Sequence, residues 1–228
     1  MKKAVAASST AARGRLLSAA LKIFALYGFE GASTRQITKE AKVNIAAIPY
    51  YFRDKEGLYK ATLEHIAGII RKNITDEALS FRQTAESKNL SVEESRALLH
   101  GLVEKFAFFL LGDKASANIA RIFLREQMDP TGDFPVLYDS LMKPVHEMLT
   151  RLVARLAKLP FPSEQATLCA HALLGQLVVF KTHREAAFRR LNWKKYGAKE
   201  KEKIVKTVIR NADYVLDAYA KNFSARLP

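Results

Sequence analysis

The fold is decided by residues 31–59, GASTRQITKEAKVNIAAIPYYFRDKEGLY. Thr34 can cap a short helix that ends at Ala41, because its hydroxyl can accept the free N–H groups of the first turn. After a tight turn, Asn44 can cap a second short helix over residues 45–51. Two short helices joined in this way predict a helix-turn-helix, in which one helix braces on the DNA backbone and the other enters the major groove.

Helical periodicity continues on both sides of the helix-turn-helix, which we place at about residues 33–52. Apolar residues recur at three- and four-residue spacing from Thr10 onward, and Gly28 lies where a helix C-terminus favours a left-handed residue. Asp54 can cap a fourth helix that runs into the low seventies, and a polar stretch over 82–89 breaks the pattern. Further helices are expected at about 91–111 (with Ser91 as the cap), 115–128, 139–158, 163–190 and 199–223.

No segment alternates apolar and polar residues as a half-buried strand does, so the predicted fold class is all-α. The expected domains are a disordered basic N-terminus (1–9), an N-terminal three-helix helix-turn-helix domain that binds DNA (10–70), and a larger helical domain for ligand binding and dimerisation (71–228). The chain has 228 residues, of which 49% are hydrophobic and 26% charged, as in an ordinary folded protein.

Several classes of protein are excluded by composition. The single cysteine, Cys169, allows neither an intrachain disulfide nor a cysteine-based zinc site, and the five histidines show no close helical pair, so we expect no metal and no cofactor. The N-terminus lacks the apolar stretch of a secretory signal, and no apolar run is long enough to span a bilayer, which favours a cytoplasmic protein without a membrane partner. No glycine-rich phosphate loop or nucleophile motif is present, so we expect no enzyme.

Positive charge gathers at the two ends of the sequence. The chain has 37 Lys and Arg against 23 Asp and Glu, a net charge of +14, divided as +7 over residues 1–60, −1 over 61–180 and +8 over 181–228. A basic surface suggests a polyanionic partner. The N-terminal excess coincides with the helix-turn-helix, whereas the C-terminal excess has no assigned role.

The two faces of the short helices have different tasks. Five apolar residues are spaced to face inward and hold the helices together: Ile37, Ala41, Val43, Ile48 and Phe52. The residues on or near the opposite face are candidates for DNA contact, because polar and aromatic tips can meet phosphates and small side chains let a helix approach the base edges: Asn44, Ile45, Ala46, Ala47, Tyr50 and Tyr51. Thr34 and Lys55 lie at helix N-termini, where free N–H groups favour a phosphate.

This combination resembles the DNA-binding domain of the TetR family of transcriptional regulators over roughly residues 10–65. The resemblance rests on the GFEGAST entry at 28–34, the frame of Ile37, Ala41 and Val43 around the turn, the YYF close at 50–52 and the DKEGL start of helix four at 54–58. It places Arg35 at a position that contacts either a guanine edge or the phosphate backbone. Pro49 departs from the family pattern, which usually has Tyr there, and its effect on the helix stays open.

The second half of the chain is similar to the regulatory domain of the CecR-like subgroup, notably at REQMDPT (125–131) and Pro144. The resemblance implies a homodimer through the last two long helices, a palindromic double-stranded operator, and a small-molecule effector whose binding shifts helix four and releases the repressor. It also implies that the basic residues of 181–228 lie at the end of the molecule away from the operator. An alternative is a non-specific, architectural DNA-binding protein. Candidate effector contacts are Phe109, Phe123, Arg125, Met142, His146, His171, Gln176 and Phe180, with Glu126 as a further polar candidate.

Overall fold

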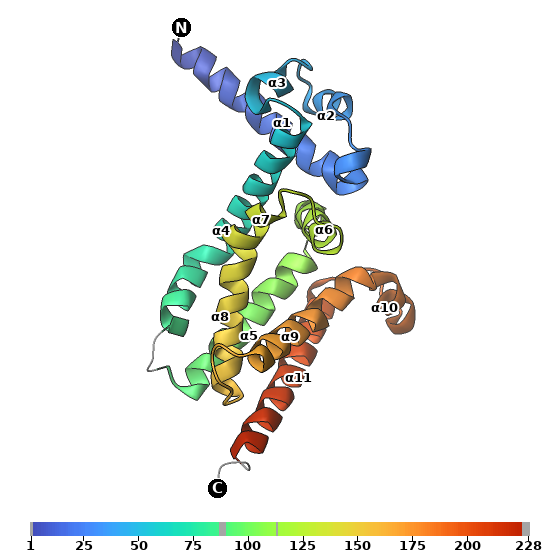
Figure 1. Cartoon of the computed structure of the whole chain (residues 1–228). Helices are drawn as coiled ribbons and strands as arrows, with labels where there is room; N and C mark the ends of the chain where they lie inside the picture. The colour runs from blue at the N-terminus through green and yellow to red at the C-terminus, as the bar shows by residue number, and fades with distance from the viewer. Residues whose placement is uncertain (1, 87–89, 113, 225–228) are drawn as a thin grey trace. The chain divides into compact units, whose positions relative to one another are not determined.

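The computed structural model describes residues 2–86, 90–112 and 114–224, and the side chains of 10–70, 90–112 and 117–222. Over these ranges the chain forms helices and no strand, which confirms the all-α class (Figure 1). The elements are α1 (Lys2–Gly31), α2 (Thr34–Ala41), α3 (Ala47–Phe52), α4 (Lys55–Glu86), α5 (Val92–Leu110), α6 (Lys114–Met128), α7 (Phe134–Leu137), the π-helical turn η1 (Tyr138–Met142), α8 (Lys143–Leu156), α9 (Glu164–Thr182), α10 (Arg184–Leu191) and α11 (Ala198–Ser224).

The chain divides into two compact units, and the divisions fall inside α4, α6 and η1. The first unit contains Met1–Lys72 and Ala117–Leu141, and the second contains Asn73–Ser116 and Met142–Pro228. The sequence predicts a regulatory domain that includes everything from residue 71 onward. Residues 117–141 instead group with the N-terminal helices, because side chains near the C-terminal end of α6 bond to α1 and α4.

Both ends of α1 differ from the expectation. The helix begins at Lys2, whereas we expected disorder over 1–9 and a helix from Thr10; Met1 itself lies outside the described residues. The alanine-rich sequence from residue 4 onward explains the extension, since alanine has the highest helix propensity. Near the other end, Gly28 has the predicted positive φ, with φ 75° and ψ −179°, and interrupts the helical geometry.

The N-cap of α2 is Ser33, so the sequence assignment of this role to Thr34 is wrong. The Gln36 N–H donates to Ser33 Oγ at 3.2 Å, and the Ser33 N–H donates to Gln36 Oε1 at 2.8 Å. This reciprocal capping box satisfies two backbone donors that a threonine one residue later would leave free. Ser91 caps α5 in the same way with Glu94, as predicted.

The first unit is held together by large apolar side chains. Leu16 and Phe24 on α1 are completely buried, and so are Ile37 on α2 and Leu63 on α4. Ile48, from α3, is 2% exposed. The hydrophobic effect therefore fixes the two short helices on α1, although neither would be stable alone in water.

Three later boundaries also differ from prediction. The helix expected over 139–158 is divided into η1 and α8, with Pro144 in the first turn of α8, where its missing N–H costs no helical bond. The helix expected over 163–190 breaks at His183 into α9 and α10. α4 continues to Glu86 through part of the stretch in which we expected a break, while residues 87–89 lie outside the described residues.

The second unit packs α5, α8, α9 and α11 against one another, and α10 against α9. Its core contains Leu99, Leu152, Leu173, Val208 and Leu216, each exposed by 4% or less. In the described ranges, no helix has a segment long and apolar enough to cross a membrane.

Candidate nucleic-acid interface

The inner face of the helix-turn-helix is buried as the sequence predicted. Ile37, Ala41, Ile48 and Phe52 expose 8% or less of their surface, and Val43 in the turn is half-buried. These side chains anchor α2 and α3 to α1, so the opposite face of α3 must point away from the core.

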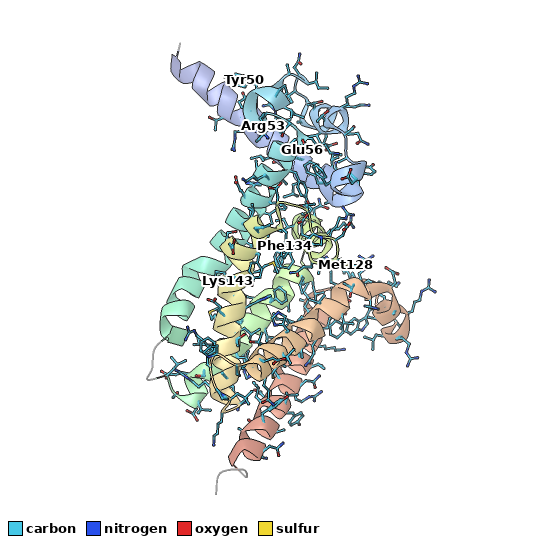
Figure 2. The ribbon with its side chains drawn as sticks, viewed as in Figure 1. Tyr50, Arg53, Glu56, Met128, Phe134 and Lys143 are labelled. Carbon is cyan, nitrogen blue, oxygen red and sulfur yellow. The ribbon has the colours of Figure 1, made fainter. Side chains whose placement is uncertain are left out.

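That opposite face presents most of the predicted contacts to solvent. Tyr50 is 77% exposed and Ile45 is 49% exposed, while Asn44 and Ala46 are also exposed. Figure 2 marks Tyr50 on α3. The alanine methyl adds little bulk beside the backbone, so this end of the helix can lie close to the floor of a groove.

The turn that leads into α3 is tighter than an α-helix, and Pro49 accounts for one of its two hydrogen bonds. The Ala47 N–H donates to the Asn44 carbonyl at 3.0 Å, and the Ile48 N–H donates to the Ile45 carbonyl at 3.2 Å, both with the three-residue spacing of a 3₁₀ turn. Pro49 has no N–H to give the Ile45 carbonyl, which accepts from Ile48 instead. α3 begins at Ala47, two residues later than predicted, and Pro49 lies within its first turn. Its N-cap is Ala46, without a side-chain cap bond, so the sequence assignment of this role to Asn44 is wrong.

The end of α3 carries contacts that sequence patterns did not single out. The rings of Tyr50 and Tyr51 meet edge to face with their centroids 4.7 Å apart. The Arg13 guanidinium lies 5.3 Å from the centroid of the Phe52 ring. Arg53 follows directly, with a φ of 72° and an exposed side chain that pairs with Asp54 at 2.7 Å. The sequence signal that identifies Arg53 as a candidate DNA contact is its position, as a basic residue immediately after the reading helix.

Thr34 and Lys55 stand at the starts of α2 and α4, and their contacts with phosphate stay a prediction. Thr34 is the first residue of α2 and is half-buried. The Lys55 ammonium lies 4.5 Å from the centroid of the Phe29 ring and donates to the Glu30 carbonyl at 3.4 Å. Arg35, one residue into α2, is exposed.

Asp54 caps α4 as predicted. Its Oδ1 accepts the Gly57 N–H at 2.7 Å, and this bond, together with the one from Arg53, lowers the pKa of the Asp54 carboxyl below its ordinary value. The ionised carboxylate thus satisfies a free donor of the first turn and complements the positive end of the helix dipole.

A buried polar cluster joins α4 to α6 within the first unit, and no local sequence pattern indicates it. Glu126 is 1% exposed, and its Oε1 accepts the Tyr59 hydroxyl at 2.6 Å. Its Oε2 accepts the Thr131 N–H at 3.2 Å and the Thr131 hydroxyl at 3.1 Å. Tyr59 is 2% exposed, and burial raises the pKa of its hydroxyl, as does the hydrogen bond to Glu126.

Arg125, the residue before Glu126, links α6 to α1. Arg125 Nη1 donates to the carbonyl of Phe24 on α1 at 2.9 Å, beside the bend at Gly28. The Phe24 ring in turn meets the Tyr59 ring edge to face, with centroids 4.8 Å apart. Two consecutive residues of α6 therefore bond to α1 and to α4.

Removal of the Tyr59 hydroxyl is expected to destabilise the protein. Tyr59→Phe keeps the ring but leaves a buried carboxylate oxygen without this donor, which costs about 1–3 kcal/mol. Urea denaturation measures the change, and Tyr27→Phe, at a 53% exposed tyrosine on α1, is the matched control. Equal stability of the two variants would show that the Tyr59–Glu126 bond contributes nothing net.

The eight candidate effector contacts belong to both units, and each is described within its own unit. Phe123 and Arg125 belong to the first unit, where the Arg125 guanidinium donates a hydrogen bond to the Phe24 carbonyl of α1. His146 and His171 contact each other, Gln176 accepts a hydrogen bond from Asn211, and the Phe180 carbonyl accepts the Tyr196 hydroxyl. Phe109 lies half-buried on α5, and Met142 is buried at the end of η1.

The second unit contains a cavity lined by other residues. Its volume is about 40 Å³, close to that of one water molecule. The lining comes from α5, α8 and α9: Leu99, Leu102, Val103, Lys105, Phe106, Val145, Leu149, Leu173, Leu174 and Leu177. Lys105 is the one charged residue in this lining. The sequence did not indicate these leucines, because a cavity residue and a core residue have the same helical spacing.

The histidine pair is a feature that local spacing could not reveal. His146 on α8 and His171 on α9 meet edge to face, with ring centroids 4.8 Å apart. Burial, with a smaller contribution from His171, lowers the pKa of His146.

Among the residues whose side chains are described, no group of three or more His, Cys, Asp or Glu could hold a metal ion. Burial raises the pKa of the Cys169 thiol, which disfavours the reactive thiolate.

Comparison with known proteins decides the family. Residues 16–62 match the model of the bacterial regulatory proteins of the tetR family, and residues 95–219 match the C-terminal domain of the HTH-type transcriptional dual regulator CecR. CecR of Shigella flexneri is 30% identical over 213 residues, which cover 92% of this chain and 93% of that protein. The chain belongs to the TetR family.

Further matches agree with this membership. The HTH-type transcriptional repressor NicS of Pseudomonas putida is 46% identical over 54 residues, covering 24% of this chain and 26% of NicS. The structure of AibR in complex with isovaleryl coenzyme A and operator DNA has a TM-score of 0.61 at 19% identity, over 87% of this chain and 96% of that one. HlyIIR, a hemolysin II transcriptional regulator, has a TM-score of 0.58 at 19% identity, over 87% and 97%.

As a TetR-family member, the chain is a DNA-binding transcriptional regulator. The tetR match covers the second half of α1, the helix-turn-helix and the start of α4, which together hold all of the predicted DNA contacts. The CecR match begins on α5 and extends into α11, so it includes Arg125, Glu126 and the cavity.

Proposed function

We propose that the chain is a homodimeric repressor that binds a palindromic operator through α2 and α3 and is released by a small effector bound in the second unit. The observation that carries the proposal is the division of α3 into a buried apolar face and an exposed face with small residues at its start. The repressor would act in the cytoplasm, where its operator DNA lies, and not as an enzyme.

The exposed face supplies the two kinds of contact that a DNA-reading helix needs, one to base edges and one to phosphates. Ala46 and Ala47 are suited to thymine methyl groups. The Asn44 side-chain oxygen is used by the Ala46 N–H at 2.9 Å, which leaves the amide NH₂ as donor to a phosphate or a base. Tyr50 and Arg35, both exposed, can reach the backbone on either side.

Exposed stripes on the last two long helices support a dimer. On α9, Leu168, Ala172, Gly175 and Val179 are exposed at alternating four- and three-residue spacing. On α11, Asn211, Tyr214 and Ala218 repeat the pattern, and Tyr214 is 69% exposed. Such a spacing lets helices from two copies pack side by side. Two copies would carry two reading helices for two half-sites about one turn of DNA apart.

The cavity indicates the kind of effector. Its lining is apolar apart from Lys105, so the effector we propose has an apolar body and one anionic group. A volume of about 40 Å³ cannot hold such a molecule, so binding must displace leucine side chains of α5, α8 and α9. The AibR complex, which contains both an acyl coenzyme A and operator DNA, gives a precedent within the same fold.

The Glu126 cluster is the route by which we propose that α6 acts on the reading helices. A shift of α6 must either move Tyr59 on α4 with it or break a buried hydrogen bond. The same shift would pull Arg125 from the Phe24 carbonyl of α1. Because α1 and α4 carry α2 and α3, their movement changes the spacing of the two reading helices in a dimer. A few kcal/mol of preference for the wrong spacing is sufficient for release.

Replacement of Lys105 tests the effector class. The probe is decanoate, and decanol is its uncharged counterpart. Decanoate should release wild-type protein from the operator at a lower concentration than decanol does. Lys105→Met should raise the decanoate concentration needed by roughly tenfold, as expected for about 1.4 kcal/mol, and leave decanol unaffected. Lys143→Met, at an exposed lysine of α8, is the control. If decanol and decanoate act equally on all three proteins, Lys105 is not an anchor.

Specificity for one DNA site tests the proposed function itself. The protein is used to select sites from a random duplex library, and the selected duplex is then competed with unrelated duplex at physiological salt. A repressor should prefer its palindrome at least about a thousandfold. A preference below about tenfold would instead favour the architectural alternative, in which phosphate contacts dominate.

A further inference from the structure

A second basic surface lies far from the helix-turn-helix in sequence, and the proposed function does not use it. Residues 184–206, here named the basic segment, contain nine Lys or Arg and three Glu, a net charge of +6. The basic segment consists of α10, the following loop and the first turns of α11 (Figure 1).

Three positive charges of the basic segment have a partner nearby. Arg184 pairs with Glu185, Lys206 pairs with Glu202, and the Lys201 ammonium lies 5.7 Å from the centroid of the Phe108 ring. The remaining six residues are exposed and form no ion pair with any residue whose side chain is described. They are Arg189, Arg190, Lys194, Lys195, Lys199 and Lys203.

An aromatic cluster makes the basic segment a defined surface. The rings of Phe188 and Tyr196 meet edge to face with centroids 4.8 Å apart, and the Trp193 ring lies 6.3 Å from that of Tyr196. The Tyr196 hydroxyl donates to the Phe180 carbonyl of α9, and the backbone N–H of Trp193 donates to the Phe188 carbonyl at 3.0 Å. The loop that carries Lys194 and Lys195 is thereby fixed to α9 and α10.

Helix stability explains only part of this charge. Arg189 and Arg190 lie in the last turn of α10, where positive charge complements the helix dipole. Lys199 lies in the first turn of α11, where the dipole disfavours a positive charge, and the adjacent Lys194 and Lys195 repel each other. Exposed cations kept together at a cost in folding energy indicate a polyanionic partner.

The distribution of apolar residues favours a nucleic acid over a membrane surface. A helix that lies on a membrane presents a broad apolar face, whereas α10 buries no residue and Leu191, 49% exposed, is the large exposed aliphatic side chain of the basic segment. The aromatic rings are half-buried in their own cluster and do not project as membrane anchors. Arg and Lys in a cluster without such a face are suited to phosphate groups.

We propose that the basic segment is a second contact surface for duplex DNA, which binds the phosphate backbone without regard to sequence. It goes beyond the proposed repressor function, because it needs neither the reading face of α3 nor an effector. A protein with both surfaces holds DNA outside its operator and can bridge two segments of duplex.

Removal of three charges from the basic segment tests this surface in the full chain. The patch variant carries R190Q, K194Q and K195Q, and the control variant carries R121Q, K143Q and K221Q at exposed positions elsewhere. Each is prepared in an A46E background, which disables the reading face. Fluorescence anisotropy then measures binding to a duplex of random sequence, about 30 base pairs long, from about 50 to 200 mM salt.

The A46E protein should retain binding to the random duplex. Its log K falls with log salt, and the patch substitutions should make this negative slope shallower by about 2.7, or about 0.9 for each phosphate that is no longer neutralised. The control variant should keep a clearly larger slope than the patch variant. Equal slopes for the two variants would overturn the proposal. So would a patch effect on vesicles containing phosphatidylserine, or on single-stranded RNA, without one on duplex DNA. Operator selectivity of the wild-type protein is measured separately, so failure of the repressor function leaves this result interpretable.

Discussion

Ala46→Glu is expected to lower operator affinity by at least about a hundredfold, the largest functional effect of any single substitution considered for this protein. Ala46 is exposed at the start of α3, where the proposed complex places it against DNA. A carboxylate there would face phosphates and base edges, and like-charge contacts across an interface cost several kcal/mol, with about 1.4 kcal/mol for each factor of ten.

The same substitution should leave the fold intact. A negative charge at a helix N-terminus is favourable to the helix, and Ala46 is the N-cap residue of α3. Thermal unfolding of the A46E protein should therefore match that of wild type, while electrophoretic mobility shifts record the weaker operator binding. Ala97→Glu, at an exposed alanine of α5, adds the same charge elsewhere and should retain full affinity. If both variants bind the operator like wild type, α3 is not the reading helix.

Gly28→Ala should destabilise the first unit by about 3 kcal/mol or more. Gly28 has φ 75° and ψ −179°, a backbone conformation that is essentially restricted to glycine, and forcing another residue into it costs about 1–3 kcal/mol. An added Cβ would also lie 2.9 Å from Arg125 Nη1, so the guanidinium would have to shift, which weakens a charged hydrogen bond to the Phe24 carbonyl of the kind that contributes about 1.5–3 kcal/mol.

A second glycine of α1 gives the matched control. A Cβ on Gly14 would meet no atom within 4 Å, and the residue is in regular helix, so Gly14→Ala should be neutral or stabilise by up to about 1 kcal/mol. Urea denaturation of both variants separates the two effects. If Gly28→Ala is as stable as Gly14→Ala, the bend at Gly28 is not a constraint and the Arg125 contact does not depend on it.

Predictions from the sequence were accurate where the relevant signal is local. The helix-turn-helix core followed from spacing alone, because apolar residues at helical intervals must face one side, and Ile37, Ile48 and Phe52 are buried as expected. The Asp54 and Ser91 caps followed from side-chain chemistry within four residues. Errors at Ser33 and Thr34 arose because two neighbouring hydroxyls can each cap the same helix, and only the backbone dihedrals distinguish them.

Contacts between residues far apart in the chain leave no local signal in the sequence. Tyr59 and Glu126 are 67 positions apart, and no pattern in either segment indicates that they bond. The candidate effector contacts stay a prediction and are mostly aromatic or polar, whereas the cavity of the second unit is lined mainly by leucines and valines. A leucine at a cavity and a leucine in a filled core occupy the same helical positions, so sequence spacing does not separate them.

Helical periodicity and caps formed by near neighbours were enough to specify the all-α class, the helix-turn-helix and its inward and outward faces. Packing between helices, which no local pattern encodes, assigned residues 117–141 to the DNA-reading unit and made Arg125 and Glu126 hold α1 and α4. It also placed the cavity among α5, α8 and α9. Buried hydrogen bonds and voids depend on which helices pack together, because packing brings together residues that no fixed interval along the chain relates.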